Sequence, residues 1–105
     1  MTEQFDPEEG QRLLALSAIR VNDAAAQIAE FLDSNGSATN KEISIFCDSV
    51  EITDELRQKA INKLDRTMDI ITQRVIASGE HVWDLKVATR KAWRHRRDRW
   101  PELFG

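Results

Sequence analysis

Residues 80–100 read EHVWDLKVATRKAWRHRRDRW, and they contain all three tryptophans and the densest positive charge of the chain. At 100° per residue, the apolar side chains of this stretch gather on one face of a helix. The residues of that face are Val82, Leu85, Thr89, Ala92, Trp93 and Trp100. Acidic residues lie near its N-terminal end and arginines near its C-terminal end, as the helix dipole favours. The pattern predicts an amphipathic helix over 80–99, which Pro101 ends.

Cations lie along one flank of this predicted helix, with a tryptophan among them. Arginine and tryptophan carry much of the energy at protein interfaces, and a cationic stripe beside an aromatic ring also suits phosphate backbones. The same residues can instead form a solvated basic face on which arginine stems cover tryptophan rings. As a partner-binding surface, with the 101–104 tail as a second anchor, it would consist of Trp83, Lys86, Arg90, Arg94, Arg97, Trp100 and Phe104.

The length and composition limit the classes of fold that the chain can adopt. We expect the 105 residues to form a single helical domain, with tails at 1–5 and 101–105. Apolar residues make up 41% and charged residues 31%, as in ordinary globular proteins. No apolar run is long enough to span a bilayer, and the acidic, polar N-terminus does not resemble a signal peptide. Cys47 is the only cysteine, so no internal disulfide can form and we expect a cytoplasmic location.

Charge divides the chain into two halves. Residues 1–56 contain 3 basic and 12 acidic side chains, whereas residues 57–105 contain 12 basic and 6 acidic ones, within a net charge of −3. The acidic half can lie against the basic half of the same chain, or two copies can associate through the same complementarity. Because the net charge is negative, long-range attraction to nucleic acid is weak, although a local basic patch can still bind it.

Helix signals continue through the first half of the chain. Asp6 as N-cap, followed by Pro7, predicts the start of a helix over 7–34. Asn35 and Gly36 are expected to end this helix. Its apolar residues fill one broad face of the helical wheel. They are Leu13, Leu14, Ala18, Val21, Ala24, Ala25, Ile28, Phe31 and Leu32, whereas Leu16 and Ile19 fall outside that face.

The stretch at about 40–51 is ambiguous. Thr39 and Glu42 form a capping-box pattern that favours a helix, whereas the residue types of EISIFCDSVEI favour a strand. Since the sequence offers no clear second strand for pairing, we expect a short helix here. Thr53 is the next N-cap, and apolar spacing predicts a long helix over 54–77 that Ser78 and Gly79 interrupt.

No catalytic or metal-binding constellation stands out. His81 and His95 lie roughly 21 Å apart on the predicted helix, and Cys47 has no second cysteine or nearby histidine in the sequence. Glycine-rich phosphate loops and nucleophile elbows are absent from the sequence. We therefore expect no enzyme activity, no catalytic residues, no cofactor and no metal.

A DNA-binding helix-turn-helix is not expected, although Thr39 to Ser44 resembles the opening of its first helix. Asp48 and Asp54 fall where the turn and the second helix would need a small or an apolar residue. The second helix would also direct an acidic N-terminus at the phosphates.

Residues 43–57, continuing to Lys63 and Leu64, resemble the first strand and helix of ribosome hibernation factors. Residues 77–80 and the basic stretch after them are similar to that family's last strand and helix. The resemblance implies a β-α-β-β-β-α domain that binds ribosomal RNA. It spans about 30 residues in two pieces, and no room is left between Ile71 and Ser78 for the family's middle strands.

The sequence therefore predicts an all-α fold, a small bundle of three long helices plus one short element at about 40–51. The long helices are expected at 7–34, 54–77 and 80–99, packed as antiparallel neighbours. We expect a non-enzymatic protein-interaction module, an adaptor, regulator or assembly subunit, that docks through its basic C-terminal helix. The alternative is an RNA- or DNA-binding protein that uses the same helix. Expected partners are another protein, a second copy or nucleic acid, but neither a membrane nor a small-molecule substrate.

Overall fold

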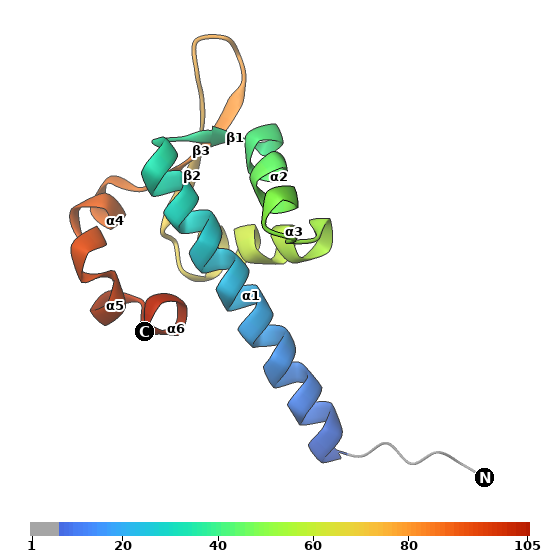
Figure 1. Cartoon of the computed structure of the whole chain (residues 1–105). Helices are drawn as coiled ribbons and strands as arrows, with labels where there is room; N and C mark the ends of the chain where they lie inside the picture. The colour runs from blue at the N-terminus through green and yellow to red at the C-terminus, as the bar shows by residue number, and fades with distance from the viewer. Residues whose placement is uncertain (1–6) are drawn as a thin grey trace.

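The computed structural model describes the backbone of residues 7–105 and the side chains of residues 16–105. These residues form helices and three short strands (Figure 1). The elements are α1 Pro7–Asn35, β1 Ala38–Thr39, α2 Asn40–Ser49, α3 Asp54–Asn62, the π-helical turn η1 Lys63–Thr67, β2 Ile71–Val75, β3 His81–Leu85, α4 Val87–Lys91, the 3-10 turn η2 Trp93–His95, α5 Arg96–Arg99 and α6 Pro101–Phe104.

The three strands form one antiparallel sheet in the order β1-β3-β2. β3 lies in the centre, where Leu85 pairs with Ile71 of β2 and Trp83 pairs with Ala38 of β1. The predicted all-α fold is therefore wrong, because the protein is a mixed α/β domain. The predicted bundle of three long helices is not present.

The expected helix over 54–77 ends early because its second half becomes a strand. α3 stops at Asn62, and the turn η1 leads into Asp69, whose φ of 57° turns the chain away from the helix. Beyond it, the sequence from Ile70 to Ile76 is rich in β-branched residues, which suit a strand. Helical apolar spacing continued past Met68 by coincidence, since Ile71 and Val75 alternate with polar residues in β2.

The expected helix over 80–99 is likewise replaced, here by β3 and a series of short helices. Gly79 has a φ of 85°, which permits a tight turn between β2 and β3. Its amide donates to Ile76 O at 2.9 Å, and the Ile76 amide donates to Glu80 O at 3.0 Å. The predicted tail at 101–105 contains the one-turn helix α6, which contacts α1.

The first half of the chain follows the sequence more closely. α1 begins at Pro7, as predicted, while Asp6 and the 1–5 tail lie outside the described residues. α2 has the predicted capping box, since the Thr39 side chain accepts from the Glu42 amide at 3.1 Å and the Glu42 carboxylate accepts from the Thr39 amide at 3.1 Å. Ile43 to Ile45 therefore lie in a helix, not in the first strand that the resemblance to ribosome hibernation factors implied.

The core forms around the C-terminal half of α1. Small residues on this helix let α3 pack close to it, and large side chains from α2, η1 and β2 complete the interior. The largest fully buried side chains are Ile28, Leu32, Ile43, Leu64, Ile71 and Cys47. α2 and α3 lie on one side of α1 and the C-terminal segment, residues 87–105, lies on the other (Figure 1).

α2 and α3 are joined by the short turn 50–53, and the β2–β3 hairpin follows them. Two helices joined by a short turn and followed by an antiparallel hairpin, with a short strand before them, form a winged helix-turn-helix arrangement. The sequence-based expectation against a helix-turn-helix did not anticipate this connectivity. It placed Asp48 and Asp54 at apolar positions, but both are exposed, and Ile52, only 5% exposed, supplies the apolar residue of the turn.

Candidate nucleic-acid interface

The exposed side of α3 presents an amide pair. Gln58 and Asn62 are four residues apart, so they lie on the same face of the helix, and both are exposed. They line a shallow hollow of about 420 Å³ together with Asn40, Arg57 and Ile61. Asn40 is the first residue of α2, so the hollow joins the beginning of one helix to the middle of the other.

Arg57 fixes the relative position of the two helices. Its Nη1 donates to Ser44 Oγ of α2 at 2.7 Å and to Asp54 Oδ1 at 2.9 Å. Below this contact, Cys47 is fully buried, and burial raises the pKa of its thiol more than the nearby Arg57 lowers it. The side of α3 that faces α2 is therefore anchored by a polar contact close to a buried side chain.

The hairpin is connected to the same surface by Trp83. Its indole Nε1 donates to Asn40 Oδ1 at 2.8 Å, so the side chain of this β3 residue meets the N-terminus of α2. Trp83 is half-buried, and it packs against the core. Of the residues predicted to bind a partner, this is the one that lies beside the α3 hollow. We call Asn40, Lys41, Gln58, Asn62 and Trp83 the α3 face.

The acids at the beginning of α3 are paired within the chain. Asp54 contacts Arg57 at 2.9 Å, and Glu55 contacts Lys59 at 3.1 Å. Lys41, exposed at the N-terminus of α2, forms no ion pair among the described residues. The repulsion of phosphate that the sequence suggested for this helix is thus reduced by neighbouring cations.

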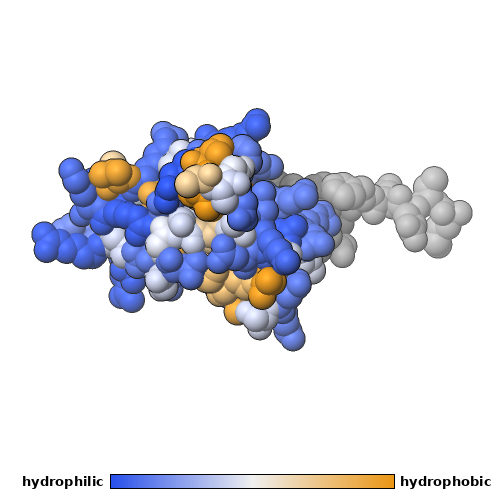
Figure 2. Space-filling model, turned by 90° about the horizontal axis from the view of Figure 1, so that it is seen from above, coloured by the Kyte–Doolittle hydropathy of each residue, from blue (hydrophilic) through white to orange (hydrophobic). Residues whose placement is uncertain are grey.

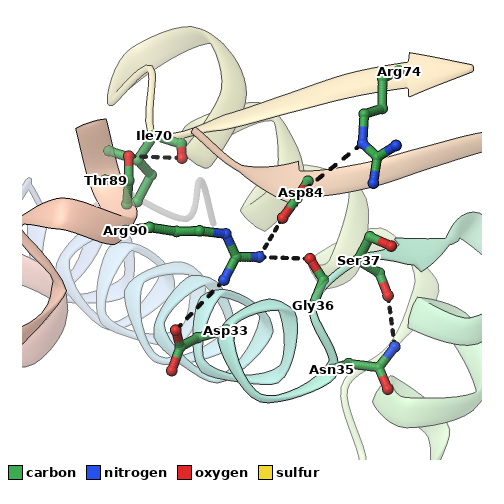
Figure 3. Close-up of polar contacts among 9 residues, drawn as sticks. All are labelled: Asp33, Asn35, Gly36, Ser37, Ile70, Arg74, Asp84, Thr89 and Arg90. Carbon is green, nitrogen blue, oxygen red and sulfur yellow. Dashed lines mark hydrogen bonds and ion pairs between the residues drawn. The ribbon is translucent and has the colours of Figure 1, made fainter. Parts of the chain in front are cut away.

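Arg90, a predicted partner-binding residue, is occupied by contacts within the chain (Figure 3). Its guanidinium forms an ion pair with Asp84 of β3, donates to Gly36 O at 2.5 Å and lies 3.8 Å from Asp33. It thereby joins the C-terminal end of α1 to the central strand. A cation is favourable there because the last carbonyls of a helix carry partial negative charge.

The remaining predicted partner-binding residues are distributed over different environments. Lys86 forms an ion pair with Asp69, whereas Trp100 and Phe104 pack against the core from the C-terminal segment. Arg94 and Arg97 are exposed and form no ion pair among the described residues. The structure therefore does not bring the seven residues together on one helix flank, and their role in partner binding stays a prediction.

The sequence analysis missed Asn40, Gln58 and Asn62. The signal was present as the β-branched segment 70–76, followed by Ser78 and Gly79 and then by Val82 and Trp83, which together indicate a hairpin. Recognising that hairpin would have made 54–62 the second helix of a helix-turn-helix, and the exposed amides at 58 and 62 would then have been the candidates.

The described surface also has a larger groove, of about 560 Å³, between α1 and the beginning of α3. The face seen in Figure 2 is mostly hydrophilic, with small separate apolar patches. Within residues that the structure describes, no three histidine, cysteine or acidic side chains are grouped to hold a metal ion. No helix in that part of the chain combines the length and apolar character needed to cross a bilayer.

Comparisons with protein-family models, with curated proteins and with solved structures found no match to this chain.

Proposed function

We propose that this protein is a non-enzymatic, cytoplasmic DNA-binding protein that reads duplex DNA with the α3 face. The observation that carries the proposal is the exposed amide pair Gln58 and Asn62 on the second helix of a winged helix-turn-helix arrangement. In that arrangement the second helix is the one that enters the major groove. α3 has 9 residues and is therefore roughly 14 Å long, enough to lie in a groove about 12 Å wide.

The chemistry of the two amides supports base readout. Asparagine and glutamine side chains each offer one acceptor and one donor, which match N6 and N7 of adenine in the major groove. Successive exposed positions four residues apart on a helix reach neighbouring base pairs. We infer a preference for adenine-containing sites.

Exposed cations on α2, η1 and β2 would contact the phosphates. Lys41 lies at the N-terminus of α2, where amide groups also point outward. Arg66 follows α3 in η1, and Arg74 lies on β2 of the hairpin; both are exposed. Arg74 is only loosely held by Asp84, at 3.8 Å. These three side chains would place the protein on the backbone while α3 supplies specificity.

The proposal can be tested by selecting sequences from a random duplex pool and measuring affinity by fluorescence anisotropy. The Gln58→Ala and Asn62→Ala variants should each lose about 1–3 kcal/mol for the selected site but keep non-specific binding. Ser34→Ala, at an exposed position of α1, is the matched control and should bind as the parent does. A pool without enrichment, or alanine variants with full affinity for the enriched site, would refute the proposal.

A second candidate function is protein binding through the C-terminal segment. It is favoured by Arg94 and Arg97, which are exposed and have no carboxylate partner among the described residues. Such cations suit an acidic segment of another protein. Arg94→Gln with Arg97→Gln should abolish a pull-down interaction that survives nuclease treatment, with DNA binding retained. Loss of DNA binding alone would assign these arginines to phosphate contacts instead.

A further inference from the structure

The first half of α1 extends beyond the body of the protein (Figure 1). The helix begins at Pro7, but Ala24 is its first buried residue within the part whose side chains are described. Leu16 is 49% exposed and Ile19 is 54% exposed, and their spacing of three places them on neighbouring parts of the surface. All the described side chains at this end of the helix, from Leu16 to Arg20, are exposed, so they are available to a partner surface.

A groove lies beside the exposed leucine. It has a volume of about 560 Å³ and runs between α1 on one side and the α2–α3 turn with the beginning of α3 on the other. Leu16 forms part of its α1 wall, while Val50 and Leu56 provide apolar surface on the opposite wall. The groove is thus wide and apolar enough to accept side chains from a helix laid along α1.

The charges on the α1 wall would complement those of the same wall on a second, antiparallel copy. Arg20 and Asp23 line the groove three residues apart, both are exposed, and neither forms an ion pair among the described residues. If a second α1 runs antiparallel about a two-fold axis, Arg20 of each copy can face Asp23 of the other. A two-fold interface requires this reciprocity, because each contact in it occurs twice.

We propose that the protein forms a homodimer in which two α1 helices pack antiparallel and each extends into the groove of the other copy. In this register, Leu16 of one copy lies opposite Gln27 of the other and enters the groove towards Val50 and Leu56. Ile19 lies at the level of Ala24 of the second copy, whose own side chain is buried in the core, so Ile19 packs against the exposed surface next to it. The two apolar side chains become buried, and two reciprocal Arg20–Asp23 pairs fix the register.

The dimer does not depend on the proposed DNA binding, because different residues carry it. If both proposals hold, two α3 helices are related by a two-fold axis and recognise a palindromic site. A dimer that binds no duplex would refute DNA binding alone. A monomer that binds an isolated half-site would refute the dimer alone.

The test is the molar mass of the full chain, measured by light scattering and sedimentation equilibrium over a wide range of concentration. The parent should be a dimer at the higher concentrations. Leu16→Glu should weaken dimerisation by at least about tenfold, since it places a charge in the groove. Ile45→Glu is the matched control, because Ile45 is a 60% exposed apolar residue on α2, outside the groove, and its change should leave the dimer intact.

Charge exchange tests the register itself. Arg20→Glu and Asp23→Arg should each weaken the dimer, because each places like charges opposite one another. The double variant should restore dimerisation, since the reciprocal pairs re-form with the signs exchanged. Circular dichroism should show all of these variants folded. The proposal is overturned if the parent remains monomeric at every concentration, even if it captures a different protein. It is also overturned if the double variant does not recover dimerisation.

Discussion

At the scale of single residues, the cations of the C-terminal segment have two different roles. Arg90 is surrounded by Asp84, Asp33 and the Gly36 carbonyl, whereas Arg94 is exposed and forms no ion pair among the described residues. Arg90→Gln should lower the free energy of unfolding by about 1–2 kcal/mol, because Asp84 is then left with only Arg74 at 3.8 Å. Arg94→Gln should change it by less than about 0.5 kcal/mol. Urea unfolding of the two variants checks this, and equal effects would contradict the assignment.

The buried thiol of Cys47 gives a pH dependence with a defined sign. Burial raises its pKa above the ordinary value of 9.0, so the unfolded chain loses this proton at lower pH than the native chain does. The contribution of this group to stability is therefore intact at neutral pH and decreases as the pH rises through the unfolded pKa. Between about pH 8 and pH 10, the parent should lose more unfolding free energy than Cys47→Ala.

Urea titrations at both pH values measure that difference. A thiol reagent provides an independent check, because it should modify Cys47 in the parent only at the rate of unfolding or local opening. Identical pH profiles for parent and alanine variant, or fast modification of the native protein, would show that the thiol is accessible.

At the scale of elements, the C-terminal segment closes one side of the core. Trp93 and Phe104 meet edge to face with ring centroids 5.3 Å apart, and the Arg96 guanidinium lies 5.1 Å from the Trp93 ring. Phe104→Ala should therefore cost about 2 kcal/mol of stability, which calorimetry detects as a lower Tm. Val87→Ala removes a 71% exposed side chain and should have little effect. An unchanged Tm for Phe104→Ala would instead favour the predicted role of Phe104 as a partner anchor.

Local signals predicted elements well where they marked the first turn of a helix. Pro7 at the start of α1 and the Thr39–Glu42 capping box of α2 need only neighbouring residues, so the sequence predicts them. The β2–β3 hairpin depends on pairing partners that the sequence does not display. Ile71 and Val75 are four residues apart and therefore also fit a helical pattern, and pairing with β3 decided between the two.

Of the candidate site, the sequence indicated only Trp83. Trp83 was selected because it is an aromatic residue among cations, and it does lie next to the hollow on α3. Gln58 and Asn62 carry no distinctive pattern in the sequence, because exposed amides are common on helices. They become candidates only once α3 is seen to be the second of two helices joined by a short turn and followed by a hairpin.

At the scale of the whole molecule, the opposite charges of the two halves meet in few ion pairs that join elements distant in the sequence. Among the described residues, Arg90–Asp33 at 3.8 Å and Arg96–Glu30 at 3.7 Å are the ion pairs that connect α1 with the C-terminal segment. Both are long and partly exposed, and such pairs contribute little to stability. The charge asymmetry therefore leaves cations of the second half available for ligands, and stability should depend only weakly on salt.

Salt separates the proposed activities in one experiment. If Lys41, Arg66 and Arg74 contact phosphates, the logarithm of DNA affinity should fall with the logarithm of salt concentration with a slope of about −3 for one copy and about −6 for a dimer. Lys41→Gln should reduce that slope by about 1 per copy, while the sequence preference set by Gln58 and Asn62 stays unchanged. Dimerisation through Leu16 and Ile19 should persist at high salt, because burial of apolar surface is not screened. Anisotropy titrations and light scattering across the same salt series measure both quantities, and a slope near zero would mean that the α3 face does not meet a phosphate backbone.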